Sequence, residues 1–352
     1  MIKADYKKYI LHFKQPAGTS RGVYTQRTSW FLFVYDSGNP AQIGIGECAP
    51  LPGLSPELNA GFTEKLDDIC KNIERYRDLK STDLAEFSSI KTGLETAFLD
   101  YQNKGTKIFY RNAFTEGKRG IKINGLIWMG SPEFLDEQIR GKLHDGYACI
   151  KMKVGAIDFE AELALIKKIR EGYGAQDVGI RVDANGAFHP AEALDKLKAL
   201  AALDVHSIEQ PVKSGQRDFL ARLCADSPLP IALDEELIGI HSLRKKHELI
   251  DDIRPQYLVL KPSLHDGFGG CREWIELAEE SKTGWWITSA LESNIGLNAI
   301  AQWTSTLENK QHHGLGTGQL FTNNFDSPLY LENTELKYDV KKAWELSALF
   351  ND

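Results

Sequence analysis

Five short apolar runs in the middle of the chain each end in a charged residue. The runs occupy 148–153, 180–183, 205–209, 231–234 and 257–261, and their last residues are Lys153, Asp183, Glu209, Asp234 and Lys261. Short apolar runs rich in β-branched residues are typical of strands buried on both faces of a parallel sheet. Successive charged residues lie 25 to 30 positions apart, which is the length of about one strand and one helix.

Eight strands of this kind are predicted in the second part of the chain. They occupy 121–127, 148–154, 178–184, 205–210, 231–235, 256–261, 285–290 and 312–317, with amphipathic helices between most of them, most clearly over 158–170 and 190–203. Eight strands in about 200 residues is the number and size of a β/α barrel, in which the carboxyl ends of the strands meet at one mouth. A doubly wound sheet is the alternative, but it would not bring five consecutive strand ends together. The pattern therefore predicts an α/β barrel.

The first part of the chain follows a different pattern. Strand-like runs over 9–13, 29–35 and 42–47 are followed by two helical stretches, 56–79 and 83–103. A meander followed by helices is typical of a small α+β domain. We therefore expect this domain over 1–110, the barrel over 111–325, and a tail over 326–352 that packs back on the first domain.

Composition and charge exclude several classes of protein. The chain has 42 basic and 49 acidic residues, and its net charge of −7 argues against a nucleic-acid binder. It has no apolar run near the ~18 residues of a membrane span, and its first residues lack the apolar core of a signal peptide. Five scattered cysteines without a C-x-x-C pair indicate reduced residues of a cytoplasmic enzyme. We expect a small-molecule partner, and no pattern indicates an oligomeric state.

Three of the charged strand ends, Asp183, Glu209 and Asp234, offer only carboxylate oxygens. Carboxylates suit Mg²⁺ or Mn²⁺, and zinc is disfavoured because no His or Cys accompanies them. Each residue taken alone has a simpler explanation, a strand-end cap or a surface ion pair. Three carboxylates that end three successive strands are better explained together, as ligands of one divalent metal ion.

Lysines flank the predicted metal site. Lys151 and Lys153 are two residues apart on one strand, so they point to the same side, and the barrel lumen is favoured over the apolar helix layer. Near a dication and a second ammonium group the pKa of a lysine falls, so Lys153 can act as a base while Lys151 helps to depress its pKa. Lys261 projects from the sixth strand, across the metal from Lys153. The alternative is that these lysines only form salt bridges with the carboxylates.

A metal ion flanked by lysines suits the removal of a proton next to a carboxylate, because a cation must hold the developing enediolate while an amine takes the proton. The order K-x-K, D, E, D, K on successive strands resembles the enolase superfamily, specifically its muconate-lactonizing branch. The resemblance covers essentially the whole chain. It implies an N-terminal capping domain and a modified (β/α)₇β barrel. It also implies metal ligands at Asp183, Glu209 and Asp234 and acid/base lysines at Lys153 and Lys261.

Three segments resemble the o-succinylbenzoate synthase family within that branch. The stretch 44–55 matches G-x-G-E-x-x-P-L-P-G-x-S, 288–297 is similar to S-S-x-x-E-S-x-x-G, and 314–317 is similar to G-L-x-T. The resemblance implies that Ser289 and the backbone around Gly314 and Gly316 hold a succinyl carboxylate. It also implies that loops over 19–24 and 51–53 close the mouth. Arg181, two residues before a metal ligand, is a further candidate for substrate binding, with a strand-end ion pair as the alternative.

One departure from the sequence pattern of the branch narrows the range of possible substrates. Dipeptide epimerases of the branch usually carry D-x-D after the eighth strand to hold an ammonium group, whereas 316–320 has no carboxylate. A glycine-rich loop can instead hold a carboxylate through backbone N–H groups, which favours a dicarboxylate substrate. The resemblance thus implies a lyase that dehydrates 2-succinyl-6-hydroxy-2,4-cyclohexadiene-1-carboxylate to o-succinylbenzoate in menaquinone biosynthesis. An N-succinylamino-acid racemase, a dipeptide epimerase and a non-catalytic barrel are the alternatives.

Overall fold

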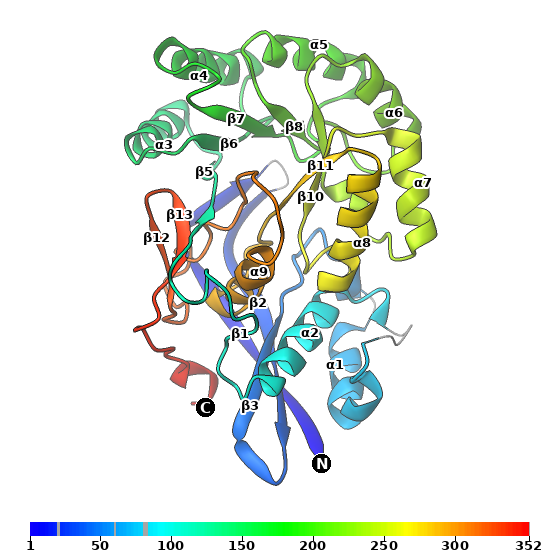
Figure 1. Cartoon of the computed structure of the whole chain (residues 1–352). Coiled ribbons are helices and arrows are strands. Elements are labelled where there is room, and N and C mark those ends of the chain that lie inside the picture. The colour runs from blue at the N-terminus through cyan, green and yellow to red at the C-terminus, as the bar shows by residue number, and fades with distance from the viewer. Residues whose placement is uncertain (20–21, 60, 80–83, 352) are drawn as a thin grey trace.

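The computed structural model describes residues 1–19, 22–59, 61–79 and 84–351, and it contains two packed parts (Figure 1). An antiparallel sheet with two helices comes from the start of the chain, and a curved parallel sheet surrounded by helices comes from the rest. A small hairpin near the C-terminus lies beside the start of the parallel sheet. The predicted α/β fold with an N-terminal α+β domain is confirmed.

The N-terminal sheet is apolar on both faces. It contains three strands in chain order, β1 (Ile2–Thr19), β2 (Gly22–Asp36) and β3 (Asn39–Cys48). Side chains alternate along β2 because successive residues of a strand point to opposite faces. Trp30, Leu32 and Val34 pack on the helices of the domain, while Phe31 and Phe33 pack towards the barrel and the C-terminal tail. The central strand therefore joins the two parts of the molecule.

The helices of this domain are shorter than the sequence pattern suggests. Instead of one helix over 56–79, the structure has α1 (Phe62–Lys71) between two 3-10 turns. The helix is interrupted where Gly61 adopts a left-handed φ of 75° and where Asn72 leaves helical geometry. The second helix, α2 (Ser88–Gln102), begins later than expected, and the predicted start at 83 lies outside the described residues.

Helix α2 lies directly on β3 because glycines line the contact. A Cβ atom at Gly46 would lie 1.8 Å from the carbonyl oxygen of Gly93, and one at Gly44 would lie 2.1 Å from that of Ala97. Real atoms cannot approach so closely. The G-x-G pattern of this strand is therefore explained by backbone packing between sheet and helix.

The barrel strands run parallel in the order in which they occur along the chain. They are β5 (Gly125–Ile127), β6 (Cys149–Lys153), β7 (Gly179–Asp183), β8 (Ser207–Glu209), β9 (Ile231–Leu233), β10 (Tyr257–Leu260) and β11 (Gly284–Ile287). The helices that enclose them are α3 (Pro132–His144), α4 (Phe159–Gly172), α5 (Pro190–Ala201), α6 (Arg217–Asp226), α7 (Leu243–Ile253), α8 (Gly267–Glu280) and α9 (Asn294–Thr304). Figure 1 shows α3 to α8 as an arc outside the strands.

Two of the eight predicted strands differ from expectation. The run 121–127 is split: β4 (Ile121–Lys122) pairs with β13 (Glu335–Tyr338) of a C-terminal hairpin that also contains β12 (Leu329–Glu332), and only β5 joins the barrel. The run 312–317 forms no regular strand. It closes the barrel through two isolated bridges, Ile123 with His313 and Thr288 with Gly314. At 121–122, pairing with the C-terminal hairpin thus overrides the local pattern. We call 312–317 the closing segment.

Alternation along the barrel strands separates an apolar layer from a polar lumen. On β6, Ile150 and Met152 belong to the large apolar cluster under the helices, so Lys151 and Lys153 face inward. Lower in the lumen, Val259 and Trp286 form a separate apolar cluster. All five cysteines are free, and no helix in the described part of the chain is long and apolar enough to cross a membrane.

The glycine contact between α2 and β3 yields a test of the fold. Gly46→Ala should destabilise the protein by about 3 kcal/mol or more, because the added methyl group overlaps the Gly93 carbonyl and forces the helix away. Gly141→Ala is a matched control, since no atom lies within 4 Å of a Cβ at this position of α3. It should be neutral or stabilising by roughly 0.4–1 kcal/mol. Equal denaturation midpoints for the two variants would contradict the packing argument.

Candidate active site

Strand register brings the five charged strand ends to one place. Lys153 of β6 is paired with Asp183 of β7, and Asp183 with Glu209 of β8. Asp234 follows β9 directly and Lys261 follows β10 directly. All five side chains are buried or nearly so. The structure therefore assembles the predicted constellation at the carboxyl end of the barrel, where β/α barrel enzymes carry their active sites.

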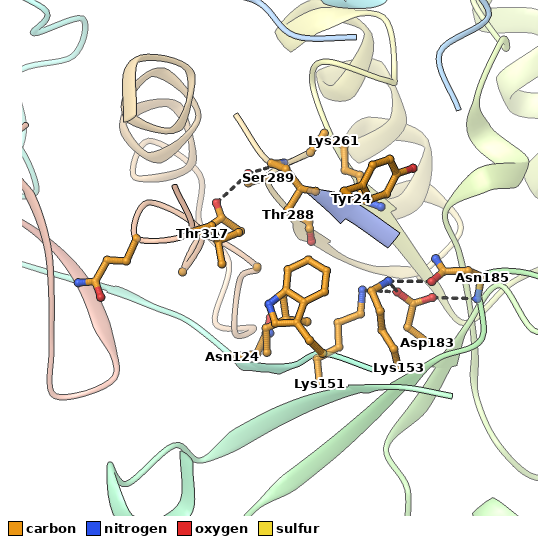
Figure 2. A pocket seen from close by; sticks show the side chains of 18 of the residues that line it. Tyr24, Asn124, Lys151, Lys153, Asp183, Asn185, Lys261, Thr288, Ser289 and Thr317 are labelled. Carbon is orange, nitrogen blue, oxygen red and sulfur yellow. Dashed lines mark hydrogen bonds and ion pairs between the residues drawn. The ribbon is translucent and has the colours of Figure 1, made fainter. Parts of the chain in front are cut away.

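Ion pairs connect the lysines and carboxylates. Lys151 Nζ lies 2.9 Å from Asp183 Oδ2 and 2.6 Å from Glu209 Oε2, and Lys153 Nζ lies 3.0 Å from Asp183 Oδ2. On the other side, Lys261 pairs with Asp234 and lies 3.8 Å from Glu209 Oε1. Figure 2 shows Lys151 and Lys153 together beside Asp183, with Lys261 across the cavity. Three ammonium groups thus balance three carboxylates.

Burial and neighbouring charges shift the pKa values of the three lysines in different directions. Burial lowers the pKa of Lys153, and the Lys151 ammonium acts in the same direction while Asp183 opposes it. Burial also acts against the charge of Lys151, yet Asp183 and Glu209 raise its pKa above the ordinary lysine value. For Lys261 the same balance, with Asp234 as the main partner, raises the pKa. Lys153 is therefore the lysine of the three that most readily gives up its proton.

The carboxylates fit a divalent cation. Glu209 Oε1 and Asp234 Oδ1 are buried and accept no hydrogen bond from the described residues, whereas Glu209 Oε2 has the Lys151 ammonium at 2.6 Å. Buried carboxylate oxygens without donors are costly, and hard cations such as Mg²⁺ are their natural partners. Within the described residues no three acidic, His or Cys side chains stand as a ready metal cluster, because the ammonium groups of Lys151 and Lys261 lie between the carboxylates. A bound ion requires these ammonium groups to shift.

Asn185 is a site residue that the sequence reasoning missed. Its Oδ1 accepts a hydrogen bond from Lys153 Nζ at 2.7 Å, and its Nδ2 donates to Glu235 Oε1 at 3.0 Å. Asn185 adopts a left-handed φ of 46°, which Asn tolerates better than most residues. The turn-forming Asp183-Ala184-Asn185-Gly186 sequence was the available signal. Asn185 fixes the direction in which the Lys153 amine points.

A cavity of about 360 Å³ opens above the charged cluster. Asp183 is its only acidic residue among the described residues that line it, whereas four lysines line it: Lys142, Lys151, Lys153 and Lys261. Gly314 and Gly316 of the closing segment line it as predicted. The remaining lining includes residues that no sequence pattern singles out, namely Asn124, Leu126, Trp128, Gln138, Tyr147 and Thr288. Apart from Asp183, the described lining is thus neutral or cationic.

The loops expected to close the mouth contribute in part. Tyr24 and Leu51 line the cavity, and the Tyr24 hydroxyl donates to the carbonyl oxygen of Pro52 at 3.0 Å. This hydrogen bond joins the two loops of the N-terminal domain over the barrel. Residues 20 and 21 of the predicted 19–24 loop lie outside the described residues.

Ser289 lines the cavity, but its hydroxyl is fully engaged. Ser289 Oγ donates to Glu292 Oε2 at 2.7 Å, and it accepts from Thr317 Oγ1 at 2.9 Å and from the Leu291 N–H at 3.0 Å. A serine hydroxyl has one proton and two lone pairs. Since its proton is already given to a carboxylate, Ser289 has no donor left for the carboxylate of a substrate.

Arg181 lies away from the cavity, in contrast to the expected contact with substrate. Its guanidinium donates to the His312 carbonyl at 2.8 Å and to Gln311 Oε1 at 2.7 Å, and it stacks 3.8 Å from the ring centroid of Trp286. It is not among the described residues that line the cavity. The ion-pair alternative also departs from the structure, because its partners are uncharged. Arg181 instead supports the closing segment from below.

Comparisons with known proteins agree with this geometry. The family model of the enolase C-terminal domain-like proteins matches residues 135–339. The chain is 44% identical to the o-succinylbenzoate synthase of Desulfotalea psychrophila, over 94% of this chain and 97% of that protein. The chain belongs to the o-succinylbenzoate synthase family of the enolase superfamily.

Two solved structures resemble this chain over nearly its whole length. The crystal structure of MenC from Desulfotalea psychrophila has a TM-score of 0.83 at 40% identity, covering 96% of this chain and 99% of that chain. A dipeptide epimerase from Enterococcus faecalis, complexed with Mg and the dipeptide L-Leu-L-Tyr, has a TM-score of 0.81 at 21% identity, covering 96% and 97%. The second likeness concerns the fold alone. The predicted capping domain and (β/α)₇β barrel are therefore confirmed.

The position of Arg181 generates a prediction. Arg181→Met should lower the free energy of unfolding by about 2 kcal/mol, because the carbonyl of His312 loses a charged donor. The KM for substrate should stay close to the wild-type value, since the guanidinium does not reach the cavity. Chemical denaturation and steady-state kinetics, with the exposed Arg140→Met as control, measure both effects. A raised KM at unchanged stability would restore Arg181 as a substrate ligand.

Proposed function

We propose that this chain dehydrates 2-succinyl-6-hydroxy-2,4-cyclohexadiene-1-carboxylate to o-succinylbenzoate in the cytoplasm, as a carbon–oxygen hydro-lyase of menaquinone biosynthesis. The 44% identity to an o-succinylbenzoate synthase supports this activity. The observation that carries the choice of substrate is the charge of the cavity. Three of its four lysines are balanced by Asp183, Glu209 and Asp234, and the fourth, Lys142, has no such partner among the three. The cavity therefore suits an anion and gives no free carboxylate to an ammonium group.

Asp183, Glu209 and Asp234 would hold a divalent ion, Mg²⁺ in this proposal, with Mn²⁺ as an alternative. When bound, the ion supplies positive charge that stabilises the enediolate formed from the ring carboxylate. Lys153 takes the proton next to that carboxylate, held towards it by Asn185. Lys261 keeps its positive charge on the opposite side and balances the developing negative charge. Lys153 then returns its proton to the departing hydroxide, so that the net loss is one water molecule and the ring becomes aromatic.

The succinyl carboxylate would be bound by backbone donors. Within the described residues, the N–H groups of Gly316 and Thr317 donate no hydrogen bond to the rest of the chain, and both residues line the cavity. Free N–H groups of a glycine-containing turn form a concave site for an anion. Ser289 then serves to hold Thr317 in place, since its own hydroxyl proton is already donated to Glu292.

Racemisation of N-succinyl amino acids is a second candidate activity. Lys153 and Lys261 flank the carboxylates from opposite sides, which is the arrangement needed to remove a proton from one face and return it to the other. An N-succinyl amino acid also carries the same anionic arm. An N-succinylamino acid racemase from Thermus thermophilus is 28% identical to this chain. We therefore expect slow racemisation beside the dehydration.

A substrate comparison tests the proposed function. In the presence of Mg²⁺, kcat/KM for the cyclohexadiene acid should exceed that for N-succinyl amino acids, and both should exceed that for dipeptides. A chelator should abolish turnover, and Asp234→Asn should weaken metal binding and turnover together. A larger kcat/KM for any dipeptide, or full turnover in excess chelator, would refute the proposal.

The role of Lys153 yields a separate prediction. Lys153→Ala should lower kcat by about 10²–10⁴, the usual contribution of a general base. Lys142→Ala is the matched control, because Lys142 lines the same cavity but has no ion pair to the three carboxylates; it should reduce kcat far less. Single-turnover kinetics separate the chemical step from product release. If Lys151→Ala is inactive while Lys153→Ala is nearly normal, the assignment of the base is reversed.

A further inference from the structure

Glu292 occupies the centre of a hydrogen-bond network that the reaction itself does not use. Its side chain is 1% exposed. Oε1 accepts from Ser263 Oγ at 2.6 Å, and Oε2 accepts from Ser289 Oγ and from the Ala290 N–H, both at 2.7 Å. The carboxylate reaches back to Ser289 because Leu291 adopts a left-handed φ of 65°, a conformation that is unfavourable for a leucine.

The network joins the ends of strands β10 and β11 to the closing segment. Ser263 lies in the loop after β10, two residues beyond Lys261. Ser289 lies just after β11, and Thr317 of the closing segment donates to Ser289. A single carboxylate therefore holds the loop behind Lys261 and, through Ser289, the wall of the cavity that contains Gly314 and Gly316.

The N-terminal domain holds the same loop from outside. Arg27 of β2 is 2% exposed and donates to the carbonyl oxygens of Ala290 and Ala49. The positive charge of Arg27 interacts with Glu292 and with Glu47, another buried glutamate. The cation that offsets the buried Glu292 charge thus comes from the domain that covers the mouth.

We propose that Glu292 is a positioning residue for substrate binding, which fixes the closing segment relative to Lys261 and couples it to the N-terminal domain through Arg27. This rests on the proposed function, because the closing segment is the part assigned to the succinyl carboxylate. Glu292 touches no reacting atom. Its effect should therefore fall on KM and on the choice of substrate, and much less on kcat.

Glu292→Gln and Ser263→Ala test the proposal. Glu292→Gln replaces one acceptor oxygen by an NH₂ group, so KM for the cyclohexadiene acid should rise roughly tenfold or more, while kcat changes less. Ser263 is not among the described residues that line the cavity. Ser263→Ala should nevertheless raise KM by about two- to tenfold, because Glu292 loses one hydrogen bond. Ser289→Ala should raise KM by a similar factor.

Glu47→Gln is the matched control. Glu47 is also 1% exposed and contacts the next part of the same loop, where it accepts from the Ser293 and Gly296 N–H groups at the start of α9. These residues do not belong to the described lining of the cavity. Glu47→Gln should lower the melting temperature without changing KM. If Glu47→Gln and Glu292→Gln raise KM alike, the effect is general damage to the domain contact and the proposal is wrong.

Two further outcomes decide the question. If Ser263→Ala leaves KM unchanged while Ser289→Ala raises it more than about tenfold, Ser289 binds the substrate directly and the proposal is overturned. The two serine variants decide the matter even where Glu292→Gln does not fold. Each KM is compared with that of the wild type on whichever substrate the wild type turns over best. A wild type that does not dehydrate the cyclohexadiene acid therefore refutes the proposed function separately.

Discussion

Charge balance at the barrel mouth constrains the rest of the structure. Three carboxylates and three ammonium groups are buried together, and each ion pair links residues on different strands. A buried charge that loses its partner costs about 3–5 kcal/mol. The register Lys153 to Asp183 to Glu209 must therefore be kept, because a slip of one residue would turn the charged side chains into the apolar layer beneath the helices.

The N-terminal domain covers the mouth and also helps to hold the barrel elements around it in place. Glu47 accepts from N–H groups at the start of α9, and Glu95 of α2 accepts from the Phe268 and Gly269 N–H groups at the start of α8. The first turn of a helix leaves N–H groups without intrahelical partners, so an acidic side chain there is stabilising. Helices α8 and α9 follow the strands that carry Lys261 and Ser289. The same set of polar contacts thus fixes the barrel strands, the helices α8 and α9 that follow them, and the N-terminal domain that covers the mouth.

The parts of the site that the sequence predicted are those that depend on strand ends. Asp183, Glu209, Asp234, Lys153 and Lys261 each follow an apolar run, and the strand pattern alone brings them together. The contacts of Arg181 could not be predicted, because alternation along β7 indicates that it faces the lumen but not how deep it lies, and its stacking on Trp286 is a tertiary contact. The run 121–127 was misjudged for a similar reason, since the partner of β4 is a hairpin more than 200 residues away.

Selectivity within the superfamily must reside in the cavity wall. A dipeptide epimerase whose structure contains Mg and a dipeptide shares this fold with a TM-score of 0.81 at 21% identity, so the barrel itself does not choose the substrate. In this chain the closing segment has no carboxylate and presents backbone N–H groups instead. Backbone donors recognise an anion only if the segment is held rigidly, because they cannot reorient as a side chain does. A closing segment without charged side chains therefore needs support from the residues behind it. Glu292, Ser289 and Thr317 provide that support, because the hydroxyl hydrogens of Ser263, Ser289 and Thr317 are each donated to an acceptor within the network, which leaves the backbone N–H of Thr317 available within the described part of the chain.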